Sequence, residues 1–367
     1  MPRSERDAVP TSVFRAVSRV LSERAPGTPP EAALSLFRGC VSRAFARRLL
    51  AEWRLEEPSR ARLFRTDAIE RELDDELRRD AELAAALDRW WSLDGAAPPR
   101  APELLGARFE VLLGLELMRM PDGWGLRSTR TRKKTGSFYT PRSLTAEVVG
   151  EALARLSAHG RLQPNTLRVC DPACGAGAFL IEVARMLEAR GVERRTIVAE
   201  ILSGTDIDPT AVAVAELVLF VWSGVLGRFA IGDALGGRGF EDSAERGDAG
   251  AVDFSTEFPE LRGRGFDLVI GNPPWIAYAG RAAKPLSPAR RQKLRERYAG
   301  FRGYPTLHGA FVERACRLAP NGVVALVVPS PIADLDGYRP LRAAVGRTHL
   351  VCEPMLEFGQ DAFHEVT

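Results

Sequence analysis

From about residue 167 onward, short apolar runs alternate with helical segments, and this pattern restricts the fold more than any other feature of the chain. The apolar runs end in acidic or glycine-rich turns and cover residues 167–170, 202–206, 229–231, 266–270 and 323–328. Helical patterns follow at 178–190, 209–224 and 306–318. Strands that alternate with helices form a parallel sheet with helices on both faces. We therefore expect a doubly wound α/β domain whose ligands bind at the carboxyl ends of the strands.

The N-terminal third has a different sequence pattern, with apolar residues at helical spacing over 12–23, 30–55 and 66–91. A Gly-Ala-Ala-Pro-Pro-Arg-Ala-Pro stretch at 95–102 is typical of a linker, and one more helix is expected over 102–120. These patterns predict a helical N-terminal domain over 1–100, a connecting segment over 101–142 and the α/β domain over 143–367. The glycine-rich stretch 236–265 is expected to be a surface loop.

Composition excludes several classes of protein. The five cysteines are widely spaced and form no Cys-x-x-Cys pair, which argues against a zinc site or a disulfide framework, and no metal is expected. The N-terminus is charged, and no stretch is long and apolar enough to span a bilayer, so we expect a cytoplasmic protein without membrane contact. The net charge of +3 is too small to identify a partner.

A turn suited to binding a ligand follows the first expected strand, in Asp171-Pro-Ala-Cys-Gly-Ala-Gly-Ala-Phe-Leu180. Gly175 and Gly177 allow a tight turn and a close approach of the backbone to a ligand. The following helix would then direct its N-terminal amides toward that ligand. A nicotinamide-type Gly-x-Gly-x-x-Gly motif would require glycine at 180, where Leu180 stands, so that cofactor is disfavoured.

Acidic residues end the next two strands. Asp206 is positioned to accept hydrogen bonds from ribose hydroxyls, whereas Asp208, before Pro209, is better interpreted as a helix cap. Asp233 follows the third strand, where a carboxylate could accept from an adenine amino group. An isolated acid in such a place is usually a turn residue, but the series of strand ends favours ligand binding.

The fourth strand runs into Gly271-Asn-Pro-Pro-Trp275, which suits methylation of an amino nitrogen. A nitrogen attached to an sp² carbon is a poor nucleophile because its lone pair is delocalised. Hydrogen-bond acceptors for both amino protons would free that lone pair. We assign one acceptor to the Asn272 side-chain oxygen and the other to a backbone carbonyl of the stiff pair Pro273 and Pro274. Trp275 offers a flat face for stacking the target ring. No general base or covalent nucleophile is needed, because positioning and electrostatics supply the catalysis.

These motifs resemble the amino-methylating DNA methyltransferases, in the branch where the cofactor motifs precede the catalytic one. Gly136-Ser-Phe-Tyr-Thr-Pro141 is similar to the segment of that family that covers the methionine end of the cofactor, and the expected helix 102–120 with it resembles the adenine methyltransferases of type I and type IIG restriction systems. The resemblance implies a Rossmann-like methyltransferase sheet, S-adenosylmethionine as cofactor and the N6 amino group of adenine in DNA as target.

The resemblance also implies roles for individual residues. The target base would be held by Asn272 to Trp275 and stacked by Phe363, for which a buried core position is a close alternative. The expected cofactor contacts are Tyr139, Thr140, Asp171, Ala173, Gly175 and Gly177 around the methionine part, Asp206 and Ile207 at the ribose, and Asp233 and Ala234 at the adenine.

Double-stranded DNA is the expected partner, because two basic clusters flank the predicted site and suit phosphate contacts. The sequence ends at Thr367, where members of the family continue into a target-recognition domain. We therefore expect either a truncated chain or a subunit that takes recognition from a specificity subunit or another phage-defence protein. The clusters comprise Arg127, Arg130, Arg132, Lys133, Lys134 and Arg142, and then Arg281, Lys284, Arg290, Arg291, Lys293, Arg295, Arg297 and Arg302.

Other functions share parts of this pattern. Methyltransferases of RNA bases or of a protein glutamine face the same electronic problem, and a cytosine amino group poses it too. Attack on cytosine carbon would need a cysteine after a proline, and none of the five cysteines follows one. The acid two residues before a lysine that a common nuclease core requires is also absent from the sequence. A non-catalytic DNA-binding subunit remains the alternative from another class.

Overall fold

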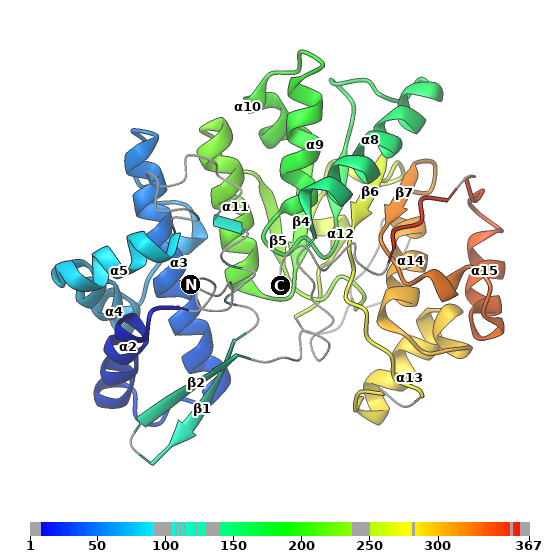
Figure 1. Ribbon diagram of the computed structural model, residues 1–367. Coiled ribbons are helices and arrows are strands. Elements are labelled where there is room, and N and C mark those ends of the chain that lie inside the picture. The colour runs from blue at the N-terminus through cyan, green and yellow to red at the C-terminus, as the bar shows by residue number, and fades with distance from the viewer. Residues whose placement is uncertain are drawn as a thin grey trace. The chain divides into compact units, whose positions relative to one another are not determined.

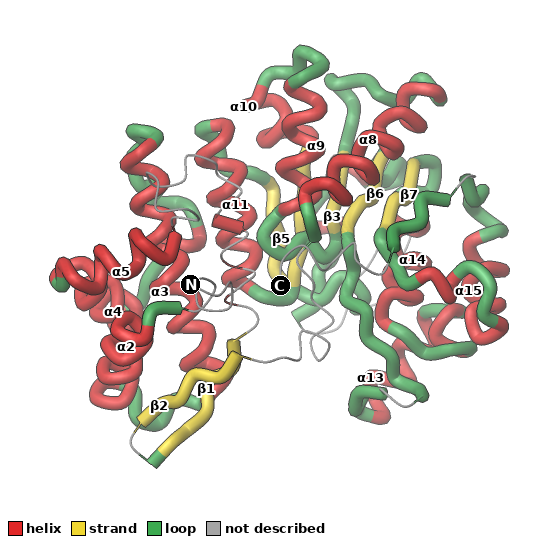
Figure 2. Tube along the Cα trace, in the orientation of Figure 1, coloured by secondary structure: helices red, strands yellow, loops and turns green. Residues whose placement is uncertain are grey.

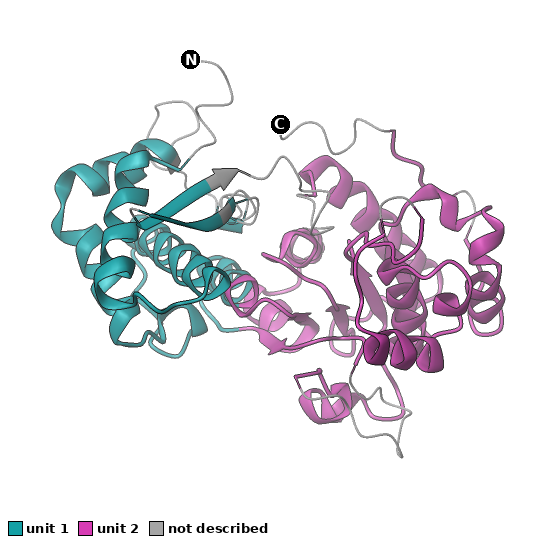
Figure 3. Ribbon diagram, turned by 90° about the horizontal axis from the view of Figure 1, so that it is seen from below, with its two compact units in different colours: residues 1–132, 213–226, 367 teal, residues 133–212, 227–366 magenta. Residues whose placement is uncertain are grey.

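The computed structural model describes residues 9–91, 105–106, 109, 112, 115–121, 123–128, 140–236, 250–280, 283–352 and 355–359 (Figure 1). The chain divides into two compact units (Figure 3). Unit 1 contains Met1–Arg132, Ala213–Leu226 and Thr367, and unit 2 contains Lys133–Val212 and Gly227–Val366. The domain boundaries expected from the sequence stay predictions, and they did not anticipate the grouping of 213–226 with the N-terminal residues.

Unit 2 is built on a parallel sheet of five strands in the order β5-β4-β3-β6-β7 (Figure 2). The central strand β3 pairs in parallel with β4 on one side and β6 on the other. The chain order reverses at that point, so the predicted doubly wound sheet is confirmed and its switch point lies between β3 and β6. The strands are β3 (Val169–Asp171), β4 (Leu202–Asp206), β5 (Arg228–Ile231), β6 (Leu268–Gly271) and β7 (Val323–Leu326).

Helices lie on both faces of this sheet. Cys170 belongs to a buried cluster that includes Ala310 and Ala315 of α14 (Leu307–Leu318). A Cβ atom on Gly204 would instead approach Leu180 of α9 (Ala178–Glu188) at 3.0 Å. Gly204 follows Ser203, the register partner of Cys170, and side chains alternate along strands, so α14 and α9 lie on opposite faces.

Capping side chains mark where two helices of unit 2 begin, α14 and α13 (Pro288–Arg297). Thr306 accepts a hydrogen bond from the Gly309 amide at 3.2 Å and caps α14. Ser287 caps α13 in the same way, through the Arg290 amide. The other helical elements of unit 2 are α8 (Arg142–Ala158), α10 (Arg194–Thr196), a π-helical turn η2 (Ile197–Ile201), η4 (Gly300–Arg302), η5 (Ser330–Ile332), η6 (Asp336–Tyr338) and α15 (Arg339–Val345).

Unit 1 is largely helical. Its elements are α2 (Thr11–Arg24), α3 (Pro30–Glu52), η1 (Arg62–Phe64), α4 (Ala68–Arg79), α5 (Ala81–Trp91), β1 (Leu115–Met120), β2 (Gly123–Ser128) and most of α11 (Pro209–Ser223). The single helix expected over 66–91 is wrong in one respect, because it breaks at Asp80. The Asp80 carboxylate accepts from the amides of Glu82 and Leu83 at 2.8 and 3.1 Å and thereby starts a new helix.

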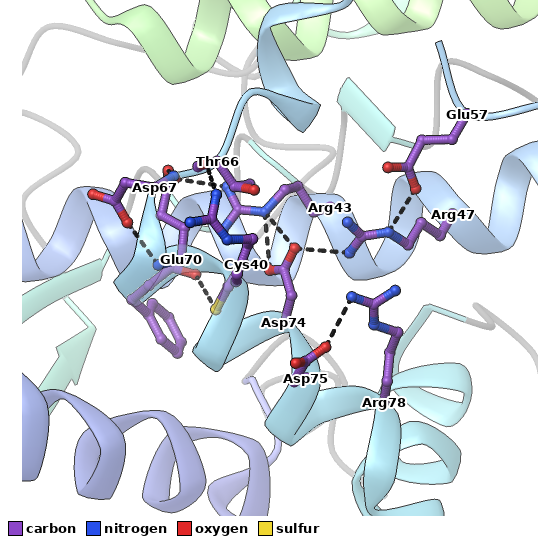
Figure 4. Close-up of polar contacts among 12 residues, drawn as sticks. Cys40, Arg43, Arg47, Glu57, Thr66, Asp67, Glu70, Asp74, Asp75 and Arg78 are labelled. Carbon is purple, nitrogen blue, oxygen red and sulfur yellow. Dashed lines mark hydrogen bonds and ion pairs between the residues drawn. The ribbon is translucent and has the colours of Figure 1, made fainter. Parts of the chain in front are cut away.

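A buried ion-pair network ties α3 to α4 within unit 1 (Figure 4). The Arg43 Nε atom lies 2.9 Å from the Asp74 carboxylate, and both side chains are buried. Glu70 and Arg47 extend the network, Glu70 by accepting from Arg43 at 2.8 Å and Arg47 by donating to Asp74 at 2.9 Å. A buried arginine is tolerated here because its charge is paired.

The helix expected over 102–120 is wrong at its C-terminal end. Residues from Leu115 to Met120 form strand β1, which pairs antiparallel with β2. Leu115 and Leu117 are buried at the two-residue spacing of a strand, and the hairpin turns at Gly123, whose φ of 127° suits glycine. Helical positions do occur before it, at Leu105, Phe109 and Leu112. The predicted linker at 95–102 lies outside the described residues.

The surface loop expected over 236–265 is also wrong over its second half. Residues 250–265 contain α12 (Phe254–Glu257) and η3 (Pro259–Leu261), and Phe254, Phe258 and Leu261 are buried. The Phe258 ring lies 5.6 Å from that of Phe266, centroid to centroid, in an edge-on contact. The two phenylalanines one helical turn apart carried this signal among glycines and acids. Residues 237–249 lie outside the described part.

Within the described ranges, no helix combines the length and apolar character needed to cross a membrane.

Candidate active site

Four strands bring predicted site residues to one edge of the sheet in unit 2. Asp171 ends β3 and Asp206 ends β4. Asp233 follows β5 by two residues, and Asn272 comes directly after β6. All neighbouring pairs are parallel, so these ends share the carboxyl edge, and Asp171 and Asn272 lie on either side of the switch point. This is the location at which open α/β sheets bind ligands.

The turn after β3 is hydrogen-bonded to the end of β4. The Gly175 amide donates to the Asp206 carboxylate at 2.9 Å, and the Ala173 amide donates to Asp171 at 3.0 Å. Gly175 and Gly177 have φ values of 51° and 88°, in the left-handed region that glycine adopts without strain. Gly177 directly precedes α9, as the sequence predicted for a turn that opens a helix.

Burial raises the pKa of both strand-end acids. The pKa of Asp171 rises to about 8, chiefly because the carboxyl is taken out of water and also because Asp206 is near. Burial raises the pKa of Asp206 as well, although the amides of Asp208 and Gly175 oppose that shift. In the described part of the chain, no lysine or arginine pairs with either carboxyl group. One buried and one half-buried acid, neither with a cationic partner among the described residues, suit a ligand that carries positive charge.

The last residue of β6 brings the two halves of the site together. A Cβ atom at Gly271 would stand 2.4 Å from the Asp171 Oδ1 atom, so a larger residue cannot take its place without displacing that carboxyl. Gly271 therefore allows the strand that leads to Asn272 to lie against the acid that ends β3. The amide of Val327, beyond β7, donates to the Gly271 carbonyl at 2.9 Å and fixes the strand end from the other side.

Asn272 presents a buried acceptor with no partner. Its Nδ2 atom donates to the Thr140 hydroxyl at 3.2 Å, and Thr140 is itself buried. Its Oδ1 atom is buried and makes no hydrogen bond to any residue that the structure describes. A buried polar atom without a partner costs about 1–3 kcal/mol, and such atoms in folded proteins call for a reason. This oxygen is therefore free to accept a hydrogen bond from a bound ligand.

The loop after Asn272 is held rigidly. The Trp275 indole Nε1 donates to the Val327 carbonyl at 3.1 Å, which fixes the edge of the ring. Pro273 is buried and Pro274 half-buried, and the Pro274 carbonyl accepts from the Ile276 amide at 3.0 Å. The loop then pairs with the start of α14, where the Leu307 amide donates to the Ile276 carbonyl at 2.8 Å.

Asp233 has partners that the sequence did not reveal. Its Oδ1 atom accepts from the Leu235 amide at 2.9 Å, and its Oδ2 atom forms an ion pair with Arg290 of α13. The sequence places Arg290 in a predicted phosphate-binding cluster, because a run of arginines does not by its composition indicate which one turns inward. Its spacing from Leu294, Arg297 and Tyr298 along one helical face is the signal that could have singled it out.

The remaining predicted residues fall in three groups. Asp208 is confirmed as a helix cap, accepting from the Thr210 amide at 2.8 Å. Ile207 is 71% exposed beside Asp206, whereas Ala234 is buried in the core. Tyr139, Phe363 and the basic residues Arg130, Arg132, Lys133 and Lys134 lie outside the described residues, as does Arg281.

Comparison with known proteins shows which families the chain resembles. Residues 200–353 match the Eco57I restriction-modification methylase family. The chain is 29% identical over 227 residues to the type II methyltransferase M.TthHB8I of Thermus thermophilus, covering 60% of this chain and 41% of that protein. It is 26% identical over 244 residues to the adenine-specific methyltransferase PglX of Streptomyces coelicolor, covering 54% of this chain and 19% of PglX.

The fold also has solved counterparts. The ATP-dependent Type ISP restriction-modification enzyme LlaBIII, solved bound to DNA, superposes with a TM-score of 0.57 at 11% identity, covering 93% of this chain and 25% of that one. This likeness is one of fold. The chain thus spans less than half the length of each of these three proteins.

The fold is a doubly wound α/β domain, and the named relatives are methyltransferases. More narrowly, residues 200–353 resemble the Eco57I restriction-modification methylase family. The resemblance to the DNA methyltransferases of restriction systems is thereby confirmed.

Proposed function

We propose that this chain transfers a methyl group from S-adenosylmethionine to the N6 amino group of adenine in DNA, within a restriction-modification or phage-defence system. The observation that carries the proposal is the buried, unpartnered Oδ1 atom of Asn272, next to a proline-stiffened loop and a fixed indole. The family match over 200–353 and the name of the adenine-specific relative support it.

The residues at the sheet edge fit the cofactor. S-adenosylmethionine carries a sulfonium and an ammonium group, and when bound it supplies an electrophilic methyl group. The strand-end acids Asp171 and Asp206 would hold its positive and hydroxyl-bearing parts, and the left-handed Gly175 and Gly177 allow the backbone to approach it closely. Asp233 would accept from the adenine amino group, since each carboxylate oxygen has lone pairs beyond those used by Leu235 and Arg290.

The protein's part in the chemistry is to hold the target nitrogen. Asn272 Oδ1 would accept a hydrogen bond from one amino proton of the target. A carbonyl of the following prolines would accept a hydrogen bond from the other, and together they concentrate the lone pair on the nitrogen. Thr140 keeps the Asn272 amide from rotating, because it receives the Nδ2 proton. Trp275 would stack on the base once it leaves the duplex, offsetting an unstacking cost of about a few kcal/mol. No side chain of this loop needs to remove a proton before transfer.

Double-stranded DNA is the proposed partner, with recognition shared by a specificity subunit or another defence protein. Exposed basic residues of α13 follow the base-binding loop, among them Lys293 and Arg295. The restriction-modification enzyme with the same fold was solved bound to DNA, which supports this choice.

Calorimetric titration with S-adenosylmethionine tests the cofactor half. We expect saturable binding by the wild type and a loss of at least about tenfold in affinity, ~1.4 kcal/mol, for Asp206→Ala. The matched control is Asp208→Ala, which removes an acid from the same loop whose carboxylate caps a helix, and it should weaken binding far less. Circular dichroism checks that both variants fold. A folded wild type that does not bind contradicts the proposal.

A further inference from the structure

Helix α13 has two chemically distinct faces. Arg290, Arg291, Leu294, Arg297 and the capping residue Tyr298 fall on one side at helical spacing, and each is buried or half-buried. The positions between them, including Lys293 and Arg295, are exposed. A run that looks uniformly basic in the sequence therefore divides into an inner and an outer set of cations.

The inner face holds the loop that follows β5. Arg290 forms an ion pair with Asp233. Near the other end of the helix, Arg297 and the Tyr298 hydroxyl both donate to the Leu235 carbonyl, at 3.0 and 2.8 Å. Leu294 and Tyr298 are almost completely buried beneath these contacts. The loop is thus fixed at two points, through the carboxylate of Asp233 and through the carbonyl two residues later.

The same face also reaches the loop that carries Asn272. The Arg291 guanidinium donates to the Tyr278 carbonyl at 3.2 Å, three residues beyond Trp275. The Lys284 amide donates to the Ala277 carbonyl at 2.9 Å in the segment that leads into the helix. Adjacent arginines of α13 therefore fix the loop at the end of β5 and the loop at the end of β6.

We infer that Arg290 is a positioning residue for the cofactor, one that orients the Asp233 carboxylate to accept the amino protons of the cofactor's adenine. The inference rests on the proposed function and deepens it. Arg290 and the Leu235 amide engage different oxygens of Asp233, so the plane of the carboxylate is fixed while lone pairs stay available. A carboxylate held in this way accepts from an amino group and repels a carbonyl oxygen at the same place.

The preference of the protein for one purine over another tests the positioning role of Arg290 separately from any effect on folding. The probes are S-adenosylhomocysteine, whose purine has an amino group at position 6, and S-inosylhomocysteine, whose purine has a carbonyl oxygen there. Both are titrated by calorimetry without DNA. We expect the wild type to prefer the adenosine compound by at least about tenfold, a preference of ~1.4 kcal/mol. Arg290→Gln should reduce that preference to less than about threefold, and Arg290→Lys, which keeps a cationic donor, should retain more of it.

Arg295→Gln is the matched control, because it makes the same chemical change on the outer face of the same helix. It should leave both affinities and their ratio unchanged in an assay without DNA. A ratio unchanged in Arg290→Gln, or tighter binding of the adenosine compound by that variant, would overturn the inference, the second by showing that Arg290 competes with the ligand. A folded wild type that binds neither compound would overturn the proposed function as well.

Discussion

The Oδ1 atom of Asn272 is a buried acceptor for which the described residues supply no donor, and we propose that a substrate amino group supplies it. The Thr140 hydroxyl accepts a hydrogen bond from Asn272 Nδ2, so the side chain cannot turn its oxygen elsewhere without losing that bond. Leaving a buried oxygen unpaired works against folding, and binding a substrate amino group removes that cost. The Asn-Pro-Pro-Trp sequence predicted the chemistry of this residue, but its anchoring by Thr140, which was expected to contact the cofactor, could not be predicted.

Removing that acceptor should separate catalysis from cofactor binding. We expect Asn272→Ala to lower the rate of methyl transfer by about 10²–10³-fold, the range seen when a positioned hydrogen-bonding group is lost, with little change in affinity for S-adenosylmethionine. Thr140→Val should have a smaller effect in the same direction, because it frees the amide to rotate. The measurements are single-turnover transfer and calorimetry. Equal losses of rate and of cofactor affinity in Asn272→Ala would contradict the assignment.

The raised pKa of Asp171 predicts how stability depends on pH. In the folded protein this pKa is about 8. In the unfolded chain it is about 3.9, so between these values the folded state holds a proton that the unfolded state has lost. Folding is therefore favoured at low pH, and the free energy of unfolding should fall as pH rises toward about 8.

Urea denaturation of the protein without cofactor, at about pH 5 and about pH 8, measures the slope of the unfolding free energy against pH. Asp171→Asn, which keeps the shape without the charge, should flatten it. Some slope should persist, because the pKa of Asp206 is raised in the same direction. An Asp171→Asn profile as steep as that of the wild type would show that the acid contributes nothing to the pH dependence.

At the level of elements, the strands and helices of the sheet were predicted closely because their patterns are local. β4 was placed at its observed bounds, since its apolar run ends at an acid. The hairpin at 115–128 was missed because apolar residues in so short a segment satisfy both helical and strand spacing. The break at Asp80 was missed because the apolar spacing continues through it, and only its capping bonds separate the two helices.

Two aspartates on α4 allow a matched test of what stabilises the helical unit. Asp74 is buried and pairs with Arg43, whereas its neighbour Asp75 pairs with Arg78 at 3.1 Å on the surface (Figure 4). Breaking a buried pair leaves an uncompensated charge, so Asp74→Ala should lower the free energy of unfolding by about 3–5 kcal/mol.

Asp75→Ala, a change of the same kind one residue along, should cost less than about 1 kcal/mol. Denaturant unfolding followed by far-ultraviolet circular dichroism measures both variants. Similar losses in the two would show that the buried network does not stabilise the unit more than an ordinary surface pair does.

At the scale of the whole molecule, the site is a consequence of strand order. Residues a hundred positions apart, such as Asp171 and Asn272, meet because parallel strands end at one edge and the chain reverses direction between β3 and β6. That much follows from the alternating pattern. The ion pair between Asp233 and Arg290 does not, because spacing along α13 can indicate an inward face but not which acid an arginine on that face meets.

The central claim is the transfer of methyl groups to adenine N6, and the product identifies it most directly. Unmethylated genomic DNA would be incubated with the protein and S-adenosylmethionine carrying a deuterated methyl group, then digested to nucleosides and analysed by mass spectrometry. We predict labelled N6-methyl-2′-deoxyadenosine from the wild type and none above background from Asn272→Ala. Label found on cytosine, or no label from a wild type that binds both cofactor and DNA, would contradict the account.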